Sequence, residues 1–405
     1  RTVNMTTPVI MALKSILVLS KTFGIISITY TFESGLLIKT SSIMAYNCLE
    51  LTRMIVLIWF TYIYHVNNRF LLRDLVLLNF WSTVIMARIN EFWIIKMING
   101  IIEFDRKVDG LPLTLLGELT YSTTKYSWNK FLAVVLVSYI SLQIFSMWLW
   151  PPARFDFSIV VKYFFEMPCI MEFVIFSTSY FYLHNLGSRF EMLNSLCKRL
   201  LDGHFTTTDT WTQSEITQFI ENIRLLHAEL CDLLRTFSSG YGVVLLFYFV
   251  FNFLGLLRCL YYLLHMSRYL SSNNSVYFSA LNISLIAMIC SQNVIFVLIL
   301  LIAISWLNRK KIEIVSFLRS IHISKLPFGT KLQIKMFMNQ LSTYEWDQIT
   351  AYGIFPMDLR IVLSFLLLLT TTLATSLQMK EHPYMVKFNN VYHSYLKFEY
   401  LNLHE

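Results

Sequence analysis

The chain has 405 residues, of which 56% are hydrophobic, 16% aromatic and only 14% charged, and its net charge is +8. Soluble domains carry about 25% charged residues, so the composition excludes an ordinary soluble protein and indicates a multi-pass membrane protein. The basic residues lie between hydrophobic segments, where membrane orientation explains them, so we expect no nucleic acid partner.

Seven segments are long and apolar enough for a helix to cross the hydrocarbon core, which takes roughly 20 residues. They are residues 42–66, 75–95, 131–150, 158–183, 241–265, 277–306 and 357–379. The predicted fold class is therefore an all-α membrane protein with seven transmembrane helices. The stretch 9–30 is also apolar, but Lys14 and Lys21 interrupt it. We expect an amphipathic surface segment there, with an additional membrane segment as the alternative.

The first span contains two charged residues. Glu50 and Arg53 lie one helical turn apart and can pair. An ion pair within a span indicates either a functional site or a structural contact that faces the helical bundle.

The charge of the loops predicts the orientation of the chain. The loops after the second, fourth and sixth spans are rich in lysine and arginine, whereas the alternate loops are short and carry little charge. The basic loops are expected in the cytosol. This divides the chain into a cytosolic N-terminal segment (1–41), the transmembrane domain (42–379) and an extracellular tail (380–405). Asn273 begins a glycosylation sequon in a loop predicted to lie outside.

The membrane domain is expected to have cytosolic helical extensions at about 185–240 and 307–356. Leucines at 193, 196 and 200 recur at helical spacing, and Thr212 with Glu215 forms a plausible capping box. Helices that lie on the membrane surface are the alternative. The orientation is opposite to that of a G-protein-coupled receptor, so the count of seven helices does not indicate that fold.

Motifs for catalysis are missing from the sequence. It has no HExxH, P-loop or GxSxG motif, its nine histidines are scattered, and its six cysteines form no CxxC pair. We therefore expect no enzyme activity, no cofactor and no metal site.

The last span carries a polar stripe. At about 100° per residue, Ser364, Thr371, Thr375 and Gln378 fall within an arc of about 60°, and Leu368 fills the gap in the same stripe. Such a stripe either lines an aqueous pore or forms hydrogen bonds between helices. One helix cannot enclose a pore, so the pore interpretation requires a symmetric oligomer.

This last helix resembles the C-terminal signature of the insect gustatory receptors, in which threonine and tyrosine are followed by five hydrophobic residues, glutamine and phenylalanine. Thr371 and Gln378 match the signature, whereas Thr372 stands in place of the tyrosine and Met379 in place of the phenylalanine. The length of the chain and its inside N-terminus are similar too. The segment before the helix also resembles that of the family, in Gly353, Phe355 and Asp358.

The resemblance implies a fold shared with insect odorant receptors, in which four subunits surround one axis at the plasma membrane. The last helix of each subunit would line a pore for monovalent and possibly divalent cations, and the cytosolic extensions would form an anchor domain with the contacts between subunits. A small-molecule tastant would bind in the outer half of each bundle. No cofactor is implied, and the assembly is homomeric or heteromeric.

Aromatic residues and one cation are expected in the outer half of the bundle, where they could bind an apolar or hydroxylated molecule. Trp and Tyr residues are equally typical of membrane interfaces. Two other functions stay open: a secondary transporter, and an odorant-receptor-like channel subunit that needs a partner. The pocket candidates are Trp81, Trp148, Tyr163, Arg258, Tyr261 and Tyr262.

Overall fold

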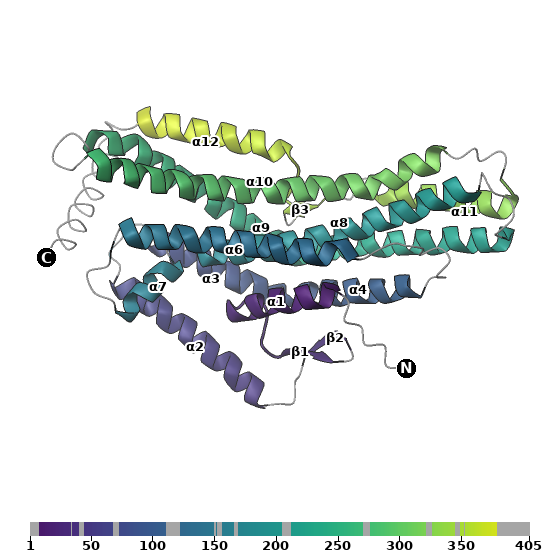
Figure 1. Ribbon diagram of the computed structural model, residues 1–405, viewed down its shortest axis with the longest axis horizontal. Helices are drawn as coiled ribbons and strands as arrows, with labels where there is room; N and C mark the ends of the chain where they lie inside the picture. The colour runs from purple at the N-terminus through teal and green to yellow at the C-terminus, as the bar shows by residue number, and fades with distance from the viewer. Residues whose placement is uncertain are drawn as a thin grey trace.

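The protein is an elongated bundle of long helices, as the computed structural model shows (Figure 1). Two ends of the bundle can be distinguished along its length. One contains the short helix α7 (Phe157–Phe165) and the other contains α11 (Phe328–Tyr344). We call them the α7 end and the α11 end. The structure describes residues 8–33, 35–39, 44–67, 73–110, 122–149, 151, 156–165, 169–204, 212–269, 276–320, 326–344, 349–351 and 353–378.

The predicted spans correspond to helices at the α7 end of the bundle (Figure 1). Among the described residues, four helical stretches are long and apolar enough to cross a membrane, at 44–67, 130–149, 213–261 and 280–319, and a shorter apolar helix covers 360–375. The chain is thus a multi-pass membrane protein, as predicted. The helices involved are α2 (Met44–Asn67), α3 (Arg73–Ile89), α6 (Ser122–Leu149), α7 with α8 (Ile170–His204), α9 (Gln213–Tyr269), α10 (Val276–Ser320) and α12 (Arg360–Gln378).

Two of the predicted spans are each divided into two helices in the structure. The segment 158–183 was expected as one helix, but α7 ends at Phe165 and α8 begins at Ile170. Pro168 lies between them in the sequence, and a proline cannot continue an α-helix because it lacks the N–H and its ring clashes with the preceding turn. The segment 75–95 is also divided, because α3 ends before Asn90 and α4 (Glu91–Asp109) follows it.

The predicted helical extensions are confirmed as helices. α8 and α9 run without interruption from the apolar region into the α11 end, and α10 does the same. α9 begins at the predicted capping box, where the hydroxyl and amide of Thr212 both donate to Glu215 Oε2, at 2.8 and 2.7 Å. The sequence did not predict that α4 would extend along the same end beside α9.

The α11 end is held together by paired polar groups. The buried Arg189 of α8 donates to both carboxylate oxygens of Asp105 on α4, at 2.8 and 2.5 Å. Asn194 Nδ2 donates to the Lys310 carbonyl oxygen of α10, at 2.8 Å. Gln340 of α11 donates to a carbonyl oxygen of α9, at 2.9 Å. Five helices therefore take part in specific contacts as well as in apolar packing: α4, α8, α9, α10 and α11.

The N-terminal segment packs against protein. Helix α1 (Pro8–Thr22) contacts α6 and α8, with Ile16 fully buried and Lys14 exposed. The segment is amphipathic as predicted, but its apolar face covers other helices, so the expectation of a membrane-surface segment is corrected. A hairpin of β1 (Tyr30–Glu33) and β2 (Leu36–Lys39) follows, with Tyr30 opposite Lys39 and Glu33 opposite Leu36.

The predicted pair of Glu50 and Arg53 is present and has a structural role. Glu50 also pairs with Arg88 of α3, and its Oε2 accepts from the Ile28 amide at 3.0 Å. Arg53 donates to the carbonyl oxygens of Lys21 and Ile26. These charges therefore hold the segment after α1 against α2 and α3.

Candidate functional site

A carboxylate is buried where the helices are apolar. Glu172 lies in the first turn of α8 and is only 5% exposed. The half-buried Arg258 of α9 is the positive charge that acts on it. Placing one charged side chain at the centre of a transmembrane helix costs about 3 kcal/mol or more, so an intramembrane pair indicates a functional site.

Other polar groups of α9 surround this carboxylate. Asn252 is 1% exposed and donates through Nδ2 to the Tyr248 carbonyl oxygen, at 2.9 Å. The Tyr248 side chain is also buried and interacts electrostatically with Glu172. Within the described part of the chain, neither Glu172 Oε2 nor Asn252 Oδ1 accepts a hydrogen bond. The site thus holds two buried acceptors that a donor could satisfy.

Helix α6 also contributes to the site, and α10 packs against α8. Tyr139 of α6 interacts electrostatically with Glu172, and its hydroxyl accepts from Gln143 Nε2 at 3.1 Å. A parallel stack of Phe176 on Phe296, with ring centroids 4.1 Å apart, holds α8 beside α10. Five side chains from three helices therefore form what we call the buried polar cluster: Tyr139, Glu172, Tyr248, Asn252 and Arg258.

The structure brings some of the predicted pocket residues together. Arg258 belongs to the buried polar cluster, and the half-buried Tyr261 lies one turn further along the same face of α9. Tyr163 is half-buried on α7. Trp81 Nε1 donates to Thr61 Oγ1 at 3.0 Å, so this residue joins α2 to α3.

Trp148 requires a correction. Its side chain is 62% exposed in the last turn of α6, so it does not line the interior of the subunit. A tryptophan near the end of an apolar helix is typical of the membrane interface, which accounts for its position. The side chain of Tyr262 and the sequon at Asn273 lie outside the described residues.

Two cavities are found elsewhere in the bundle. A cavity of about 250 Å³ lies between α8 and α10 and is lined by His184 and Trp306 among others. A larger one of about 920 Å³ lies between α4 and α9. Within the described residues, no group of three or more His, Cys, Asp or Glu side chains could hold a metal ion.

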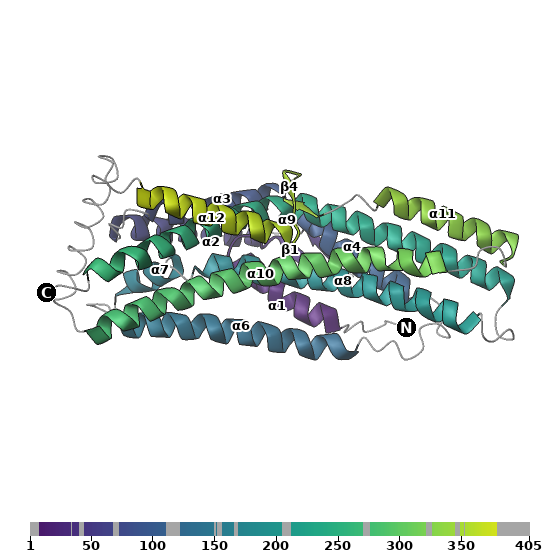
Figure 2. The same ribbon diagram turned by 90° about the horizontal axis from the view of Figure 1, so that it is seen from above.

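Helix α12 lies on the outside of the bundle next to α9 (Figures 1 and 2). Phe365 contacts Phe253 of α9, with ring centroids 5.0 Å apart, while Leu369 and Leu373 are half-buried. The opposite face is exposed within the described part of the chain. Every residue of the predicted stripe is exposed on that face, namely Ser364, Leu368, Thr371, Thr375 and Gln378.

The segment before α12 is fixed to α9. Strand β3 (Thr350–Ala351) pairs with β4 (Phe355–Pro356), and Gly353 in the turn adopts φ of 75°, which L side chains rarely adopt. Ser238 Oγ of α9 donates to the Thr350 carbonyl oxygen at 3.0 Å. Asp358 then accepts from the Arg360 amide at 2.9 Å, which caps α12. The N-terminal end of α12 is therefore tied to α9 at Ser238.

The fold is that of a nearly all-helical, multi-pass membrane protein. The family model for 7tm chemosensory receptors matches residues 13–381, so the chain belongs to this family of chemosensory receptors. The predicted resemblance to insect chemoreceptors is confirmed at this level. No curated protein sequence matches the chain.

Solved structures show the same fold. The insect olfactory receptor OR5 from Machilis hrabei is 13% identical, with a TM-score of 0.52 over 91% of this chain and 97% of that chain. The structure of OR5 in complex with eugenol is 12% identical, with a TM-score of 0.53 over 92% of this chain and 99% of that chain. At these identities, the similarity establishes the fold alone.

The buried polar cluster was not predicted as a unit, although one signal was present. Glu172 is an acidic residue within the predicted span 158–183, and such a residue is a candidate functional site. Tyr248 and Asn252 carry no comparable signal, because single tyrosine and asparagine residues are common in transmembrane helices.

Proposed function

We propose that this chain is a subunit of a ligand-gated, non-selective cation channel of the plasma membrane that acts as a gustatory receptor. The observation that carries the proposal is the exposed stripe on α12, which turns away from its own bundle. In a fourfold assembly, these stripes would face a common axis and line the pore. A ring of Gln378 amides would present carbonyl oxygens without a fixed charge, so monovalent cations would be poorly distinguished, and divalent ions could follow.

The ligand would bind at the buried polar cluster, in the half of the bundle predicted to be outer. OR5 was solved in complex with eugenol, which supports a small molecule as the class of ligand. Glu172 and Asn252 offer acceptors, so a tastant with hydroxyl or amine donors fits best. Tyr261 and Tyr163 are proposed to flank the ligand with apolar surface.

The path from ligand to pore would be short. Asn252 belongs to the buried polar cluster, and the next residue, Phe253, contacts Phe365 of α12. A ligand that draws the Tyr248–Arg258 segment of α9 toward Glu172 would shift Phe253 and with it α12. The segment before α12 is tied to α9 at Ser238, so the motion would tilt α12 about that point.

Cysteine accessibility tests the pore. Gln378→Cys is expected to react with a charged thiol reagent in the open channel and to block the current, whereas Leu373→Cys, on the half-buried face of α12, is expected to stay inert. Reactivity at 373 with none at 378 would show that the stripe contacts helices or lipid. A homogeneous monomer in detergent, with uptake in place of current, would favour a secondary transporter.

Ligand recognition is tested separately. The chain is expressed alone and with candidate partner receptors, and currents are recorded against a panel of tastants, which also distinguishes an odorant-receptor-like subunit that needs a partner. Glu172→Gln is expected to weaken the response to the active tastant without changing surface expression. Glu191→Gln makes the same change on the same helix at the α11 end and is the control. Equal responses in both variants would remove Glu172 from the ligand site.

A further inference from the structure

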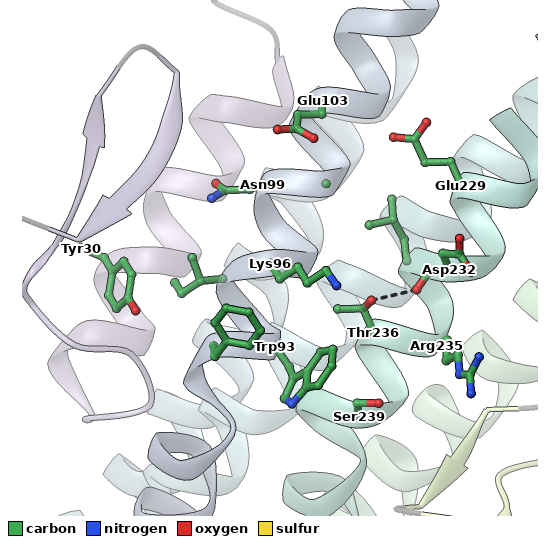
Figure 3. A pocket seen from close by; sticks show the side chains of 14 residues that line it. Tyr30, Trp93, Lys96, Asn99, Glu103, Glu229, Asp232, Arg235, Thr236 and Ser239 are labelled. Carbon is green, nitrogen blue, oxygen red and sulfur yellow. Dashed lines mark hydrogen bonds between the residues drawn. The ribbon is translucent and has the colours of Figure 1, made fainter. Parts of the chain in front are cut away.

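The cavity of about 920 Å³ between α4 and α9 lies outside the proposed ligand and pore sites (Figure 3). Its side walls are the two helices and the β1–β2 hairpin. The hairpin is fixed to α4 because Asn99 exchanges two hydrogen bonds with the backbone of Leu37, at 2.8 and 2.9 Å. Gly100 allows α4 to approach α9 closely, since a Cβ there would lie 2.2 Å from a Leu233 methyl carbon.

The lining residues are ordered along the two helices. On α4, Trp93 is followed one turn later by Lys96 and about two turns after that by Glu103. α9 runs in the opposite direction and gives the same order with Ser239, Arg235 and Asp232. Figure 3 shows Trp93 and Ser239 on one side, Lys96, Thr236 and Asp232 in the middle and Glu103 on the other side, with Arg235 beside Ser239. Along α4, an aromatic, a basic and an acidic residue therefore succeed one another.

Charges of both signs line this cavity, and the Lys96 ammonium group lies over the Trp93 ring, 5.3 Å from its centroid. Glu229 pairs with Lys107 at 2.8 Å. Within the described residues, Lys96, Arg235, Glu103 and Asp232 form no ion pair with a protein side chain. A ligand that carries one negative and one positive group would complement both kinds of charge.

The order from aromatic to basic to acidic residues also matches the direction from the hydrocarbon core of the membrane to the α11 end. Exposed apolar residues on α3 and at the start of α4 lead to Trp93, at the spacing of one helical face: Ile85, Ile89 and Phe92, which are 50%, 67% and 66% exposed. Trp93 thus lies toward the hydrocarbon, and Glu103 lies toward the α11 end. In an aminophospholipid, the acyl chains, the phosphate and the amine follow in this order.

We propose that this cavity binds the phosphoethanolamine headgroup of an inner-leaflet phospholipid. Lys96 and Arg235 hold the phosphate, Glu103 and Asp232 hold the ammonium group, and the acyl chains lie along Ile85, Ile89 and Phe92. Bound lipid fixes α4 to α9 below the membrane. The proposal rests on the orientation of the chain and is independent of the tastant and the pore.

Native mass spectrometry of the full chain tests the proposal. The protein is released from phosphatidylcholine nanodiscs that contain phosphatidylethanolamine, phosphatidylglycerol or neither, and the retained lipid is counted. The double variant Lys96→Gln/Arg235→Gln is expected to lower retention of both added lipids about tenfold. Glu103→Gln/Asp232→Asn is expected to lower retention of phosphatidylethanolamine alone, because phosphatidylglycerol has no amine.

Two controls make the result decisive. Lys198→Gln removes an exposed charge from α8 and is expected to change nothing. Soluble glycerophosphoethanolamine competes with the lipid if the headgroup alone is recognised, and fails to compete if the acyl chains are needed. Unchanged retention in both double variants would overturn the proposal. Dissociation of the oligomer in the double variants, with lipid retained, would show instead that these charges contact a neighbouring subunit.

Discussion

The two ends of the bundle differ in the hydrogen-bond partners of their buried polar groups. At the α11 end, Arg189 has Asp105, and Asn194 has the Lys310 carbonyl oxygen. At the α7 end, Glu172 and Asn252 are equally buried, yet each keeps an acceptor atom without a hydrogen bond among the described residues. Two buried atoms at the α11 end also lack a hydrogen bond among the described residues, Arg224 Nε and Gln333 Oε1. The two ends therefore differ in the groups that join helices: paired groups join them at the α11 end, whereas Glu172 and Asn252 at the α7 end offer acceptors that a ligand could satisfy.

This difference suggests how stability and response are divided along the same helices. An unpaired buried acceptor costs about 1–3 kcal/mol, which a ligand with a donor recovers on binding. Paired groups at the α11 end resist such change. α8, α9 and α10 run through both ends, so one end can hold the subunit while the other moves.

The largest expected effect is at Arg189. Arg189→Ala removes the partner of Asp105, whose side chain is 13% exposed, and should lower the stability of the subunit by about 3–5 kcal/mol. Thermal unfolding followed by size-exclusion chromatography measures the loss. The double variant Arg189→Met/Asp105→Leu removes both charges and should recover most of it. A single variant as stable as the parent would contradict the view that the α11 end depends on paired groups.

The second effect concerns pH at the same end. Burial lowers the pKa of His227 to about 4, from an ordinary value of 6.5. The neutral ring has a partner on each side, the Lys311 carbonyl oxygen at 3.3 Å from Nε2 and Cys231 Sγ at 3.6 Å from Nδ1. The unfolded chain therefore takes up this proton first as the pH falls.

The contribution of neutral His227 to the free energy of unfolding should therefore be fully present above pH 6.5. The free energy of unfolding should fall by about 3 kcal/mol between pH 6.5 and 4. Thermal unfolding across this range measures the slope, and His227→Gln should flatten it. Equal slopes in the two proteins would mean that His227 does not control the loss.

A smaller effect is expected where α9 begins. Thr212→Ala removes the hydroxyl that donates to Glu215 and caps the helix. Amides in the first turns of α9 should exchange with solvent about fivefold faster, since this cap contributes to local stability only. Hydrogen exchange with mass spectrometry reports the change. Ser214→Ala removes an exposed hydroxyl from the same turn and is the matched control, which should have little effect.

The sequence predicted the helical membrane fold, the long extensions and the cap at Thr212, because each depends on local periodicity or on a short motif. It did not predict that α7 ends at Phe165 and α8 begins at Ile170, because the prediction of a span rested on the number of hydrophobic residues. Nor did it predict that α1 packs against α6 and α8, since an amphipathic face does not indicate whether it covers lipid or protein.

The candidate site was harder to predict than the fold. Arg258 was selected as an arginine within a span, and the structure places it near Glu172 of α8. The two residues are far apart in the sequence, so only the packing of α8 against α9 brings them together. Trp148 shows the opposite error, because an aromatic residue near a helix end has the same appearance in sequence whether it faces a pocket or lipid.

The smallest effect on stability should come from Asn252, and it compares the two ends most directly. Asn252→Leu removes a buried amide whose oxygen is unpaired among the described residues and whose nitrogen donates to the Tyr248 carbonyl oxygen of the preceding turn. Its stability should therefore stay within about 0.5 kcal/mol of the parent, while the response to tastant is lost.

Asn194→Leu makes the identical change at the α11 end, where the amide bridges α8 and α10. It should cost about 1–2 kcal/mol and leave the response per channel unchanged. Thermal unfolding and tastant-evoked currents on both variants separate the two roles. If Asn252→Leu destabilises the protein as much as Asn194→Leu, the unpaired acceptor is filled by the protein itself, and the difference between the two ends disappears.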